Sequence, residues 1–362
     1  MNANLKATQY GWQDKISHHS QIGGIETSVL DNGAGRGTRI AWFNTGSGLR
    51  FKVVIDRAMD IADAFFNQHS LTWISSVAIV APQTFSDRGI GWLRTFGGGL
   101  LTTCGLTHVG GPESDEYGER GIHDRISNLP AEIESIIQPN LQQGQLEMSM
   151  TGKVYQVQVF GPVLELRRTI SCTIGQSTIR IHDVVTNRYN SPTPHMLLYH
   201  LNLGWPLADV GAEILWKGSW QSREGQAKAR IFREGHSFRT CSAPLEEHRG
   251  GGEEAAFIDI SPDADGQCTC GLHNHKIGLA LALHYQKAQL PWMTNWQHWG
   301  MGEYVTGLEP GTHPPIGQAE ARRQLTLIHL APGESRTYSL TLEVLDDPGK
   351  MKALLNNTNQ PY

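Results

Sequence analysis

The chain has 362 residues, 39% of them hydrophobic, and a formal net charge of -5. This length can bury a large core, and the slightly acidic balance excludes the broad cationic surface that nucleic-acid binding requires. Residues 1–15 lack the apolar core of a secretory signal, and no stretch reaches the roughly 18 consecutive apolar residues of a membrane span. We therefore expect a cytoplasmic protein without nucleic-acid or membrane partners, whose five scattered cysteines stay reduced.

Alternation of apolar and polar residues predicts half-buried strands along the chain. It begins with Leu146, Met148 and Met150, and a second apolar set of Tyr155, Val157 and Val159 follows, with Gln156 and Gln158 between them. Similar alternation recurs at residues 179–182 and 338–344. Residues 277–283 differ, because both alternating sets are apolar or small, which predicts a central strand.

Frequent turn residues, among 40 glycines and 17 prolines, separate these runs and leave few long helical windows. Many short strands with such spacing indicate an all-β antiparallel sandwich or barrel. We expect one domain at 25–345, an N-terminal extension at 1–24 and a short tail at 346–362, with the clear helical candidate at 349–356. The polar stretch 223–252 is interpreted as an excursion between strands.

The segment 196–206 places polar groups in an apolar strand. In extended geometry Met196, Leu198, His200 and Asn202 share one face, so that an imidazole and an amide project together. Such a histidine is either a proton donor or a buried residue satisfied by a nearby carbonyl, and the sequence leaves both open.

The segment 304–315 contains a carboxylate beside a turn. Pro310 disfavours a helical conformation for Glu309 and, with Gly311, invites a turn, so the carboxylate should lie at the mouth of a strand. That position suits a general base. A glutamate beside a turn is more often simply solvated.

Two further segments combine cations with other polar groups. Extended geometry at 119–130 would place His123 and Arg125 on the same side, where they could bind sugar hydroxyls or form an ordinary edge strand. Arg57 and Asp60 are similar candidates, with a surface ion pair as the alternative.

The segment 291–299 interleaves three tryptophans with amide and imidazole groups. Aromatic faces fit the C–H side of a pyranose, and polar tips such as those of Gln297 and His298 can reach its hydroxyls. Packing of Trp296 and its neighbours in the core is the competing interpretation.

The sequence does not predict a metal site or a phosphate loop. A cluster of two cysteines and two histidines at 268–275 departs from the spacing of structural zinc sites. The glycine run at 97–99 lacks the Lys-Ser/Thr continuation of a phosphate-binding loop.

Three motifs together resemble the aldose 1-epimerase or galactose mutarotase-like superfamily, in an uncharacterised bacterial branch. They are Gly-Ile-His-Asp-Arg-Ile-Ser-Asn-Leu-Pro-Ala-Glu at 121–132, Tyr-His-Leu-Asn-Leu-Gly at 199–204, and Gly-Leu-Glu-Pro-Gly-Thr at 307–312. The similarity extends over roughly residues 25–345. It implies a β-supersandwich that binds a free sugar in an open cleft.

The resemblance also implies roles for individual residues. Glu309 would remove the proton from the anomeric hydroxyl, His200 would protonate the ring oxygen, and His123 would assist there, with no metal or redox cofactor. Eight residues are expected to contact the substrate: Arg57, Asp60, Arg125, Asn202, Trp296, Gln297, His298 and His313. A homodimer is compatible with the sequence.

Departures from the family pattern keep alternatives open. The better-known mutarotases have Asn-His-x-Tyr-Phe-Asn-Leu where this chain has Tyr-His-Leu-Asn-Leu, and their substrate-binding aspartate has no clear counterpart. Arg57 and Arg125 could instead clamp an acidic sugar. The rival functions are a metal-dependent sugar isomerase using His123, His200, His298 and His313 as ligands, a non-catalytic carbohydrate-binding protein and, as a weaker option, a glycosidase.

Overall fold

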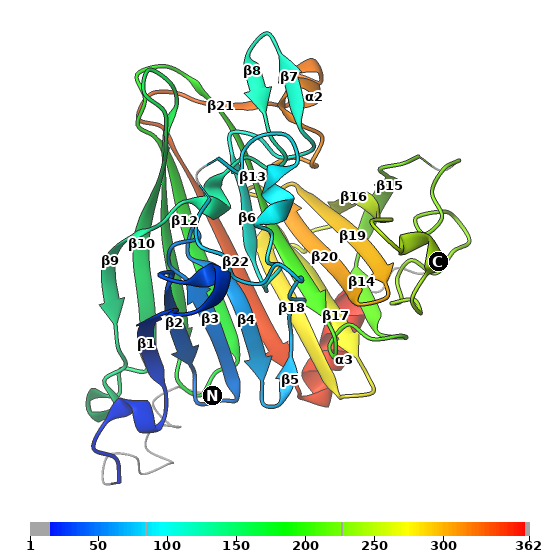
Figure 1. Cartoon of the computed structure of the whole chain (residues 1–362). Helices are drawn as coiled ribbons and strands as arrows, with labels where there is room; N and C mark the ends of the chain where they lie inside the picture. The colour runs from blue at the N-terminus through cyan, green and yellow to red at the C-terminus, as the bar shows by residue number, and fades with distance from the viewer. Residues whose placement is uncertain (1–14, 84, 226, 359–362) are drawn as a thin grey trace.

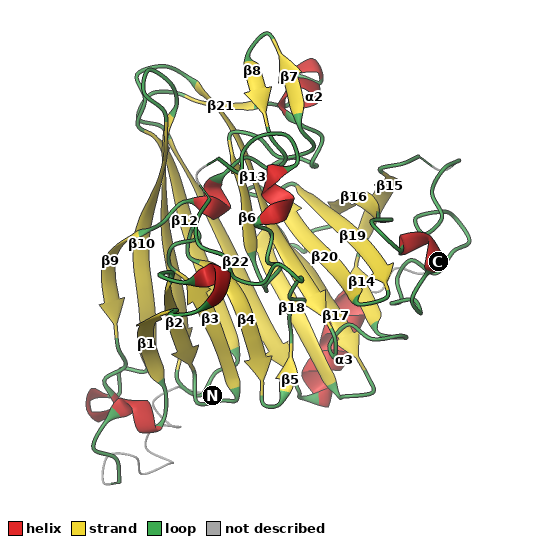
Figure 2. Cartoon of the chain, in the orientation of Figure 1, coloured by secondary structure: helices red, strands yellow, loops and turns green. Residues whose placement is uncertain are grey.

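Antiparallel strands dominate the protein, which we describe from a computed structural model covering residues 15–83, 85–225 and 227–358 (Figures 1 and 2). The five-stranded sheet consists, in spatial order, of β1 (Gly24–Val29), β2 (Arg39–Asn44), β3 (Leu49–Val54), β4 (Asp60–Phe66) and β5 (His69–Ser70). Bridges between Ile61 and Leu101 and between Thr72 and Leu203 connect this part of the chain to the neighbouring sheet that carries the candidate site.

The other two sheets are larger. The eight-stranded sheet has the order β14 (Glu213–Trp216), β17 (Gln267–Asn274), β18 (Leu279–Gln286), β22 (Ser335–Leu345), β12 (Thr178–Asn187), β11 (Val163–Thr173), β10 (Glu147–Val157) and β9 (Glu132–Ile137). The seven-stranded sheet has the order β15 (Gly218–Ser222), β16 (Glu254–Ile260), β19 (Trp292–Gly300), β20 (Glu303–Gly311), β13 (Thr193–Gly204) and β21 (Ile328–Leu330), with β6 (Thr102–Leu106) also paired to β13. A separate hairpin is formed by β7 (Glu113–Asp115) and β8 (Gly118–Arg120).

Helices are short and few beside the strands (Figure 2). The α-helices are α2 (Gln318–Arg323) and α3 (Pro348–Thr358), and the 3-10 helices are η2 (His19–Gln21), η3 (Gly33–Gly35), η4 (Gly91–Arg94), η5 (Ile126–Asn128), η6 (Leu141–Gln143) and η7 (Glu246–His248). Helix α3 contains the helical candidate of the sequence, whereas α2 was not predicted. None of the helices in the described ranges is long and apolar enough to cross a membrane.

One hydrophobic core joins the three large sheets. Its members include Phe43 and Phe51 from the five-stranded sheet, Met148 from the eight-stranded sheet and Leu308 from the seven-stranded sheet. Apolar area removed from water is the dominant favourable contribution to such a fold. The antiparallel β-sandwich expected from the sequence is thus confirmed, and the polar stretch after β15 is indeed an excursion, because β15 and β16 pair with each other across it.

Both faces of strand β18 are apolar because both are covered by other parts of the protein. Leu281 and Leu283 join the main core, while Ala280 and Ala282 on the other face form a second cluster with Leu354 of α3. The strand lies inside its sheet, between β17 and β22. The predicted central strand is confirmed, and α3 covers its outer face.

The expected orientation of the second apolar set in β10 was wrong. Strand β10 pairs with β11 in one continuous register, so Met148, Met150 and Gln156 share a parity and all three are buried. Val157, of opposite parity, is 47% exposed. At the end of this strand the buried position is occupied by Gln156, where alternation predicts an apolar residue.

Candidate active site

Three neighbouring strands position the candidate catalytic residues on one face. Leu198 pairs with Gly311 and Leu201 with Leu308, a register that places His200 of β13 opposite Glu309 of β20. On the other side of β20, Glu309 pairs with Thr294 of β19. Directly opposite residues are the closest side-chain neighbours in an antiparallel sheet. Strand register therefore brings together two motifs that are far apart in the sequence.

The side chains of His200 and Glu309 meet as this register predicts. Nε2 of His200 lies 3.4 Å from Oε1 of Glu309. Gly307 makes room for the carboxylate, because a Cβ atom at this glycine would lie 2.3 Å from Oε1 of Glu309. Both side chains are buried, and neither Oε1 of Glu309 nor Nδ1 of His200 has a hydrogen-bond partner. Buried polar atoms normally have partners, so two such atoms side by side mark this pair as a candidate functional site.

His123 approaches the pair from the segment that precedes η5. Its ring is 6.2 Å from that of His200, at an interplanar angle of 88°, and its buried Nδ1 also has no hydrogen-bond partner. The backbone of His123 and Asp124 is left-handed, with φ values of 55° and 59°. The extended geometry expected here was therefore wrong, and His123 and Arg125 do not share a side.

Aromatic rings surround the two histidines. Phe96 lies 5.1 Å and Trp296 5.4 Å from the ring of His200, and Trp92 lies 4.9 Å from that of His123. Trp73 contacts both Phe96 and Trp296. Such a wall combines a large apolar contact area with a few polar atoms, as small-molecule sites generally do.

Burial sets the protonation of this group. It raises the pKa of Glu309 well above the ordinary value of 4.5, and the charge of Glu253 acts in the same direction while that of Arg223 opposes it. Burial also lowers the pKa of His200 to about 3 and that of His123 well below 6.5. One proton is thus held between His200 and Glu309 over a wide pH range, and in the free protein it resides on the carboxyl group.

Three expected substrate-binding residues lie on or beside this face. Asn202 is buried next to His200 and its Oδ1 has no partner, while its Nδ2 donates to the carbonyl oxygens of Gly99 and His200. Trp296 donates from Nε1 to Glu253 over 2.6 Å. The ring of His298 stacks on that of Trp296 at a centroid distance of 6.3 Å.

The remaining expected contacts lie elsewhere. Arg57 donates to the backbone carbonyls of Ser127, Val80 and Thr95 and lines a separate cavity of about 340 Å³. Arg125 donates to the carbonyl of Val157 and lines another cavity.

Gln297 and His313 are engaged within the protein. Gln297 faces the core, where Nε2 donates to the carbonyl of Phe238. His313 bridges the hydroxyl of Thr312 and the carbonyl of Thr326. These two residues and the two arginines stay predictions as substrate ligands, but they do not form a single clamp with the His200–Glu309 pair.

Asp60, the last expected contact, belongs to a buried ionic network behind β13. Arg168, fully buried, donates to both carboxylate oxygens of Asp183 over 2.9 and 2.7 Å and to Asp60 over 3.0 Å. Tyr199, which precedes His200, donates to Asp183 over 2.7 Å, and Thr103 of β6 donates to Asp60. The network therefore ties β11, β12, β4 and β6 to the back of the strand that carries His200.

Sequence reasoning missed the aromatic residues that precede β6. Trp73, Trp92 and Phe96 come from irregular or 3-10 segments, where no periodicity marks a shared face. The one available signal was the density of aromatic and glycine residues between 73 and 99.

The described residues do not form a metal centre of the usual kind. No group of three or more His, Cys, Asp or Glu side chains within the described ranges is arranged to hold a metal ion. Cys268 and Cys270 are buried on β17, and all five cysteines are free thiols. His273 of the same strand is paired with Glu213 instead.

Comparison with solved structures shows the same fold. A proposed aldose 1-epimerase from Klebsiella pneumoniae superimposes with a TM-score of 0.79 at 24% identity, over 92% of this chain and 86% of that one. A galactose mutarotase-like protein from Clostridium acetobutylicum gives 0.64 at 10% identity, over 90% and 100%. Galactose 1-epimerase from Lactobacillus acidophilus gives 0.57 at 12% identity, over 89% and 98%. No curated protein matches the chain.

The fold is therefore that of the galactose mutarotase-like β-sandwich proteins. Within this class, residues 35–344 match the sequence model of a family described as a domain of unknown function, DUF4432. The chain belongs to that family, which covers most of its length.

Proposed function

We propose that the protein is an aldose 1-epimerase, which interconverts the α and β anomers of a free sugar. The observation that carries this proposal is the buried His200–Glu309 pair, whose free polar atoms lie beside His123 within an aromatic wall. Anomer exchange needs only an acid and a base held across one small substrate. The names of the structural relatives, which include aldose and galactose 1-epimerases, support the same reaction.

Ring opening moves two protons in opposite directions. As the anomeric hydroxyl loses its proton to Glu309, its oxygen forms the aldehyde C=O bond, the bond between C1 and the ring oxygen breaks, and His200 protonates that oxygen. His123 assists at the ring oxygen. After rotation of the aldehyde, the reverse transfers close the ring on the other face. The pair therefore carries one proton at the start of the cycle, and that proton must first pass from the carboxyl group of Glu309, where it resides in the free protein, to His200.

The shifted pKa values of His200 and Glu309 predict that kcat/KM stays close to its maximum down to unusually low pH. The one-proton state is lost below the pKa of His200, about 3, and above the raised pKa of Glu309. An unperturbed pair would instead lose activity below about 4.3 and above about 6.5. We expect kcat/KM at pH 4 to lie within about 1.2-fold of its value at pH 6, against a drop of about twofold for ordinary pKa values. Exchange rates corrected for the uncatalysed reaction measure this, with circular dichroism to verify folding.

Saturation-transfer NMR across neutral, deoxy and acidic aldoses tests the function itself. We expect accelerated anomer exchange for neutral sugars and its loss in His200→Asn. Acidic sugars should react more slowly, because Arg57 and Arg125 do not converge on the pair. Exchange of no sugar by a folded protein that binds one would contradict the proposal and favour the binding protein. Activity that depends on an added metal and is lost with a chelator would favour the metal-dependent isomerase.

A further inference from the structure

The left-handed turn that carries His123 requires an explanation. Two consecutive residues other than glycine, His123 and Asp124, have φ values of 55° and 59°. Such strained conformations persist only where surrounding contacts hold them in place, and they are frequent at functional sites. Backbone bonds hold this turn in part: N–H of His123 donates to Gly110 and its carbonyl accepts from Gly105, both over 3.0 Å.

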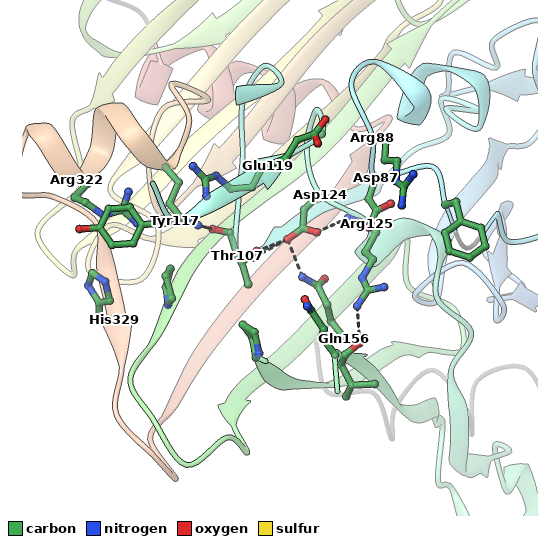
Figure 3. A pocket seen from close by; sticks show the side chains of 18 of the residues that line it. Asp87, Arg88, Thr107, Tyr117, Glu119, Asp124, Arg125, Gln156, Arg322 and His329 are labelled. Carbon is green, nitrogen blue, oxygen red and sulfur yellow. Dashed lines mark hydrogen bonds between the residues drawn. The ribbon is translucent and has the colours of Figure 1, made fainter. Parts of the chain in front are cut away.

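The carboxylate of Asp124 supplies the other contacts (Figure 3). Its Oδ2 accepts from the backbone N–H of Thr107 at 3.0 Å, from the hydroxyl of Thr107 at 2.6 Å and from Nε2 of Gln156 at 2.7 Å. Its Oδ1 accepts from the backbone N–H of Arg125 at 2.9 Å. Four donors from three parts of the chain thus converge on one carboxylate, and charged hydrogen bonds of this kind are the strong ones.

Gln156 connects this turn to the opposite sheet. It is the buried residue that interrupts the apolar face of β10, and its Oε1 accepts from N–H of Leu106 at 3.2 Å while its Nε2 reaches Asp124. The amide therefore joins β10, the end of β6 and the turn. A buried network whose members are all satisfied fixes a single arrangement.

Asp124 borders a cavity that the catalytic candidates do not line. Together with Thr107, Arg125 and Gln156 it lines a cavity of about 1260 Å³ whose lining includes neither His123 nor His200 (Figure 3). A change in the Asp124 side chain can thus affect the His200–Glu309 pair only indirectly, through the turn or through Thr107 and Gln156, which contact β6 beside β13.

We infer that Asp124 is a positioning residue, which fixes the turn so that the imidazole of His123 stays beside that of His200. The inference rests on the proposed function, since it adds a positioning residue to the same site. It assigns to the Asp124–Gln156 bond the role of joining the turn to the eight-stranded sheet.

The first arm of the test observes His123 without any sugar. In ¹⁵N-histidine-labelled protein, the signal of His123 is identified by its disappearance in His123→Asn. In the wild type, burial keeps its pKa well below 6.5. We expect Asp124→Ala to release the ring to solvent and return this pKa toward 6.5, while Glu119→Ala, which removes an exposed carboxylate from the same cavity wall, leaves it unchanged.

The second arm measures anomer exchange in a double-mutant cycle. We expect Asp124→Ala to lower kcat on the order of 10- to 100-fold with KM changed less than threefold, as misplacement of a reacting group does. In the His123→Asn background the same substitution should add less than a twofold loss, because the group that Asp124 positions is already absent.

The outcomes are distinguishable. Losses that multiply in the double variant, or a His123 signal unaffected by Asp124→Ala in a folded protein, would overturn the positioning role. Absence of exchange in the wild type would contradict the proposed function instead, and the His123 titration would still decide whether Asp124 holds the ring. Thermal unfolding of each variant identifies any general loss of folding.

Discussion

Glu309→Gln should abolish most anomer exchange while leaving the fold intact. The amide has the shape of the carboxyl group but cannot accept the anomeric proton, so we expect kcat/KM to fall by about 10²- to 10⁴-fold. Stability should change little, because burial favours the neutral form of Glu309, and the glutamine is neutral as well. Saturation-transfer NMR gives the rate, and sugar binding in the variant shows that the site is retained.

A matched control separates this effect from the loss of a carboxylate in general. Glu147→Gln makes the same chemical change at an exposed position of β10 and should exchange anomers at the wild-type rate. Wild-type exchange by Glu309→Gln would remove Glu309 from the mechanism. Loss of binding together with exchange would indicate a role in holding the sugar.

Arg168→Met should strongly destabilise the folded protein. It would remove the ion-pair partner of the buried carboxylates of Asp60 and Asp183, and breaking a buried ion pair from one side costs about 3–5 kcal/mol of unfolding free energy. Urea-induced unfolding of the wild type and of Arg168→Met at neutral pH measures this loss as a lower urea concentration at the unfolding midpoint of the variant.

The same variant should show a characteristic pH dependence. Burial already raises the pKa of Asp60 although the charge of Arg168 opposes it, so without Arg168 this pKa should rise further. The extra destabilisation from Asp60 is then fully present above its pKa in the folded variant, and it is lost as the pH falls through that value to the pKa in the folded wild type. Arg167→Met is the matched control, since Arg167 is 45% exposed on the same strand and its ion pair with Glu134 is worth at most about 1 kcal/mol. An equal loss in both variants would argue against the buried network.

Much of the architecture could be predicted from local pattern. Alternation at 338–344 indicated β22, whose residues Tyr338, Leu340 and Leu342 are buried. The shared face of His200 and Asn202 followed from the two-residue period of β13. These features depend on neighbours along one strand, which is why the sequence alone contains them.

Contacts between segments that are distant in the sequence could not be predicted from local patterns. That His200 lies opposite Glu309 follows from the β13–β20 register, which no local pattern specifies. The extended geometry expected around His123 failed because Asp124 is held by Thr107 and Gln156, residues 17 and 32 positions away. The inward orientation of Gln156 likewise reflects a tertiary hydrogen bond that overrides apolar alternation.

Gly307 gives the candidate site a marker that can be followed through protein families. Any other residue there would direct its Cβ to within 2.3 Å of the Glu309 carboxylate oxygen, so the carboxylate would have to leave its position opposite His200. A relative that keeps the glutamate but has acquired a side chain at this position is therefore expected to have become a pseudoenzyme, which retains the fold without turnover. Under the proposed function, the residue at position 307 should therefore distinguish family members that exchange anomers from those that do not.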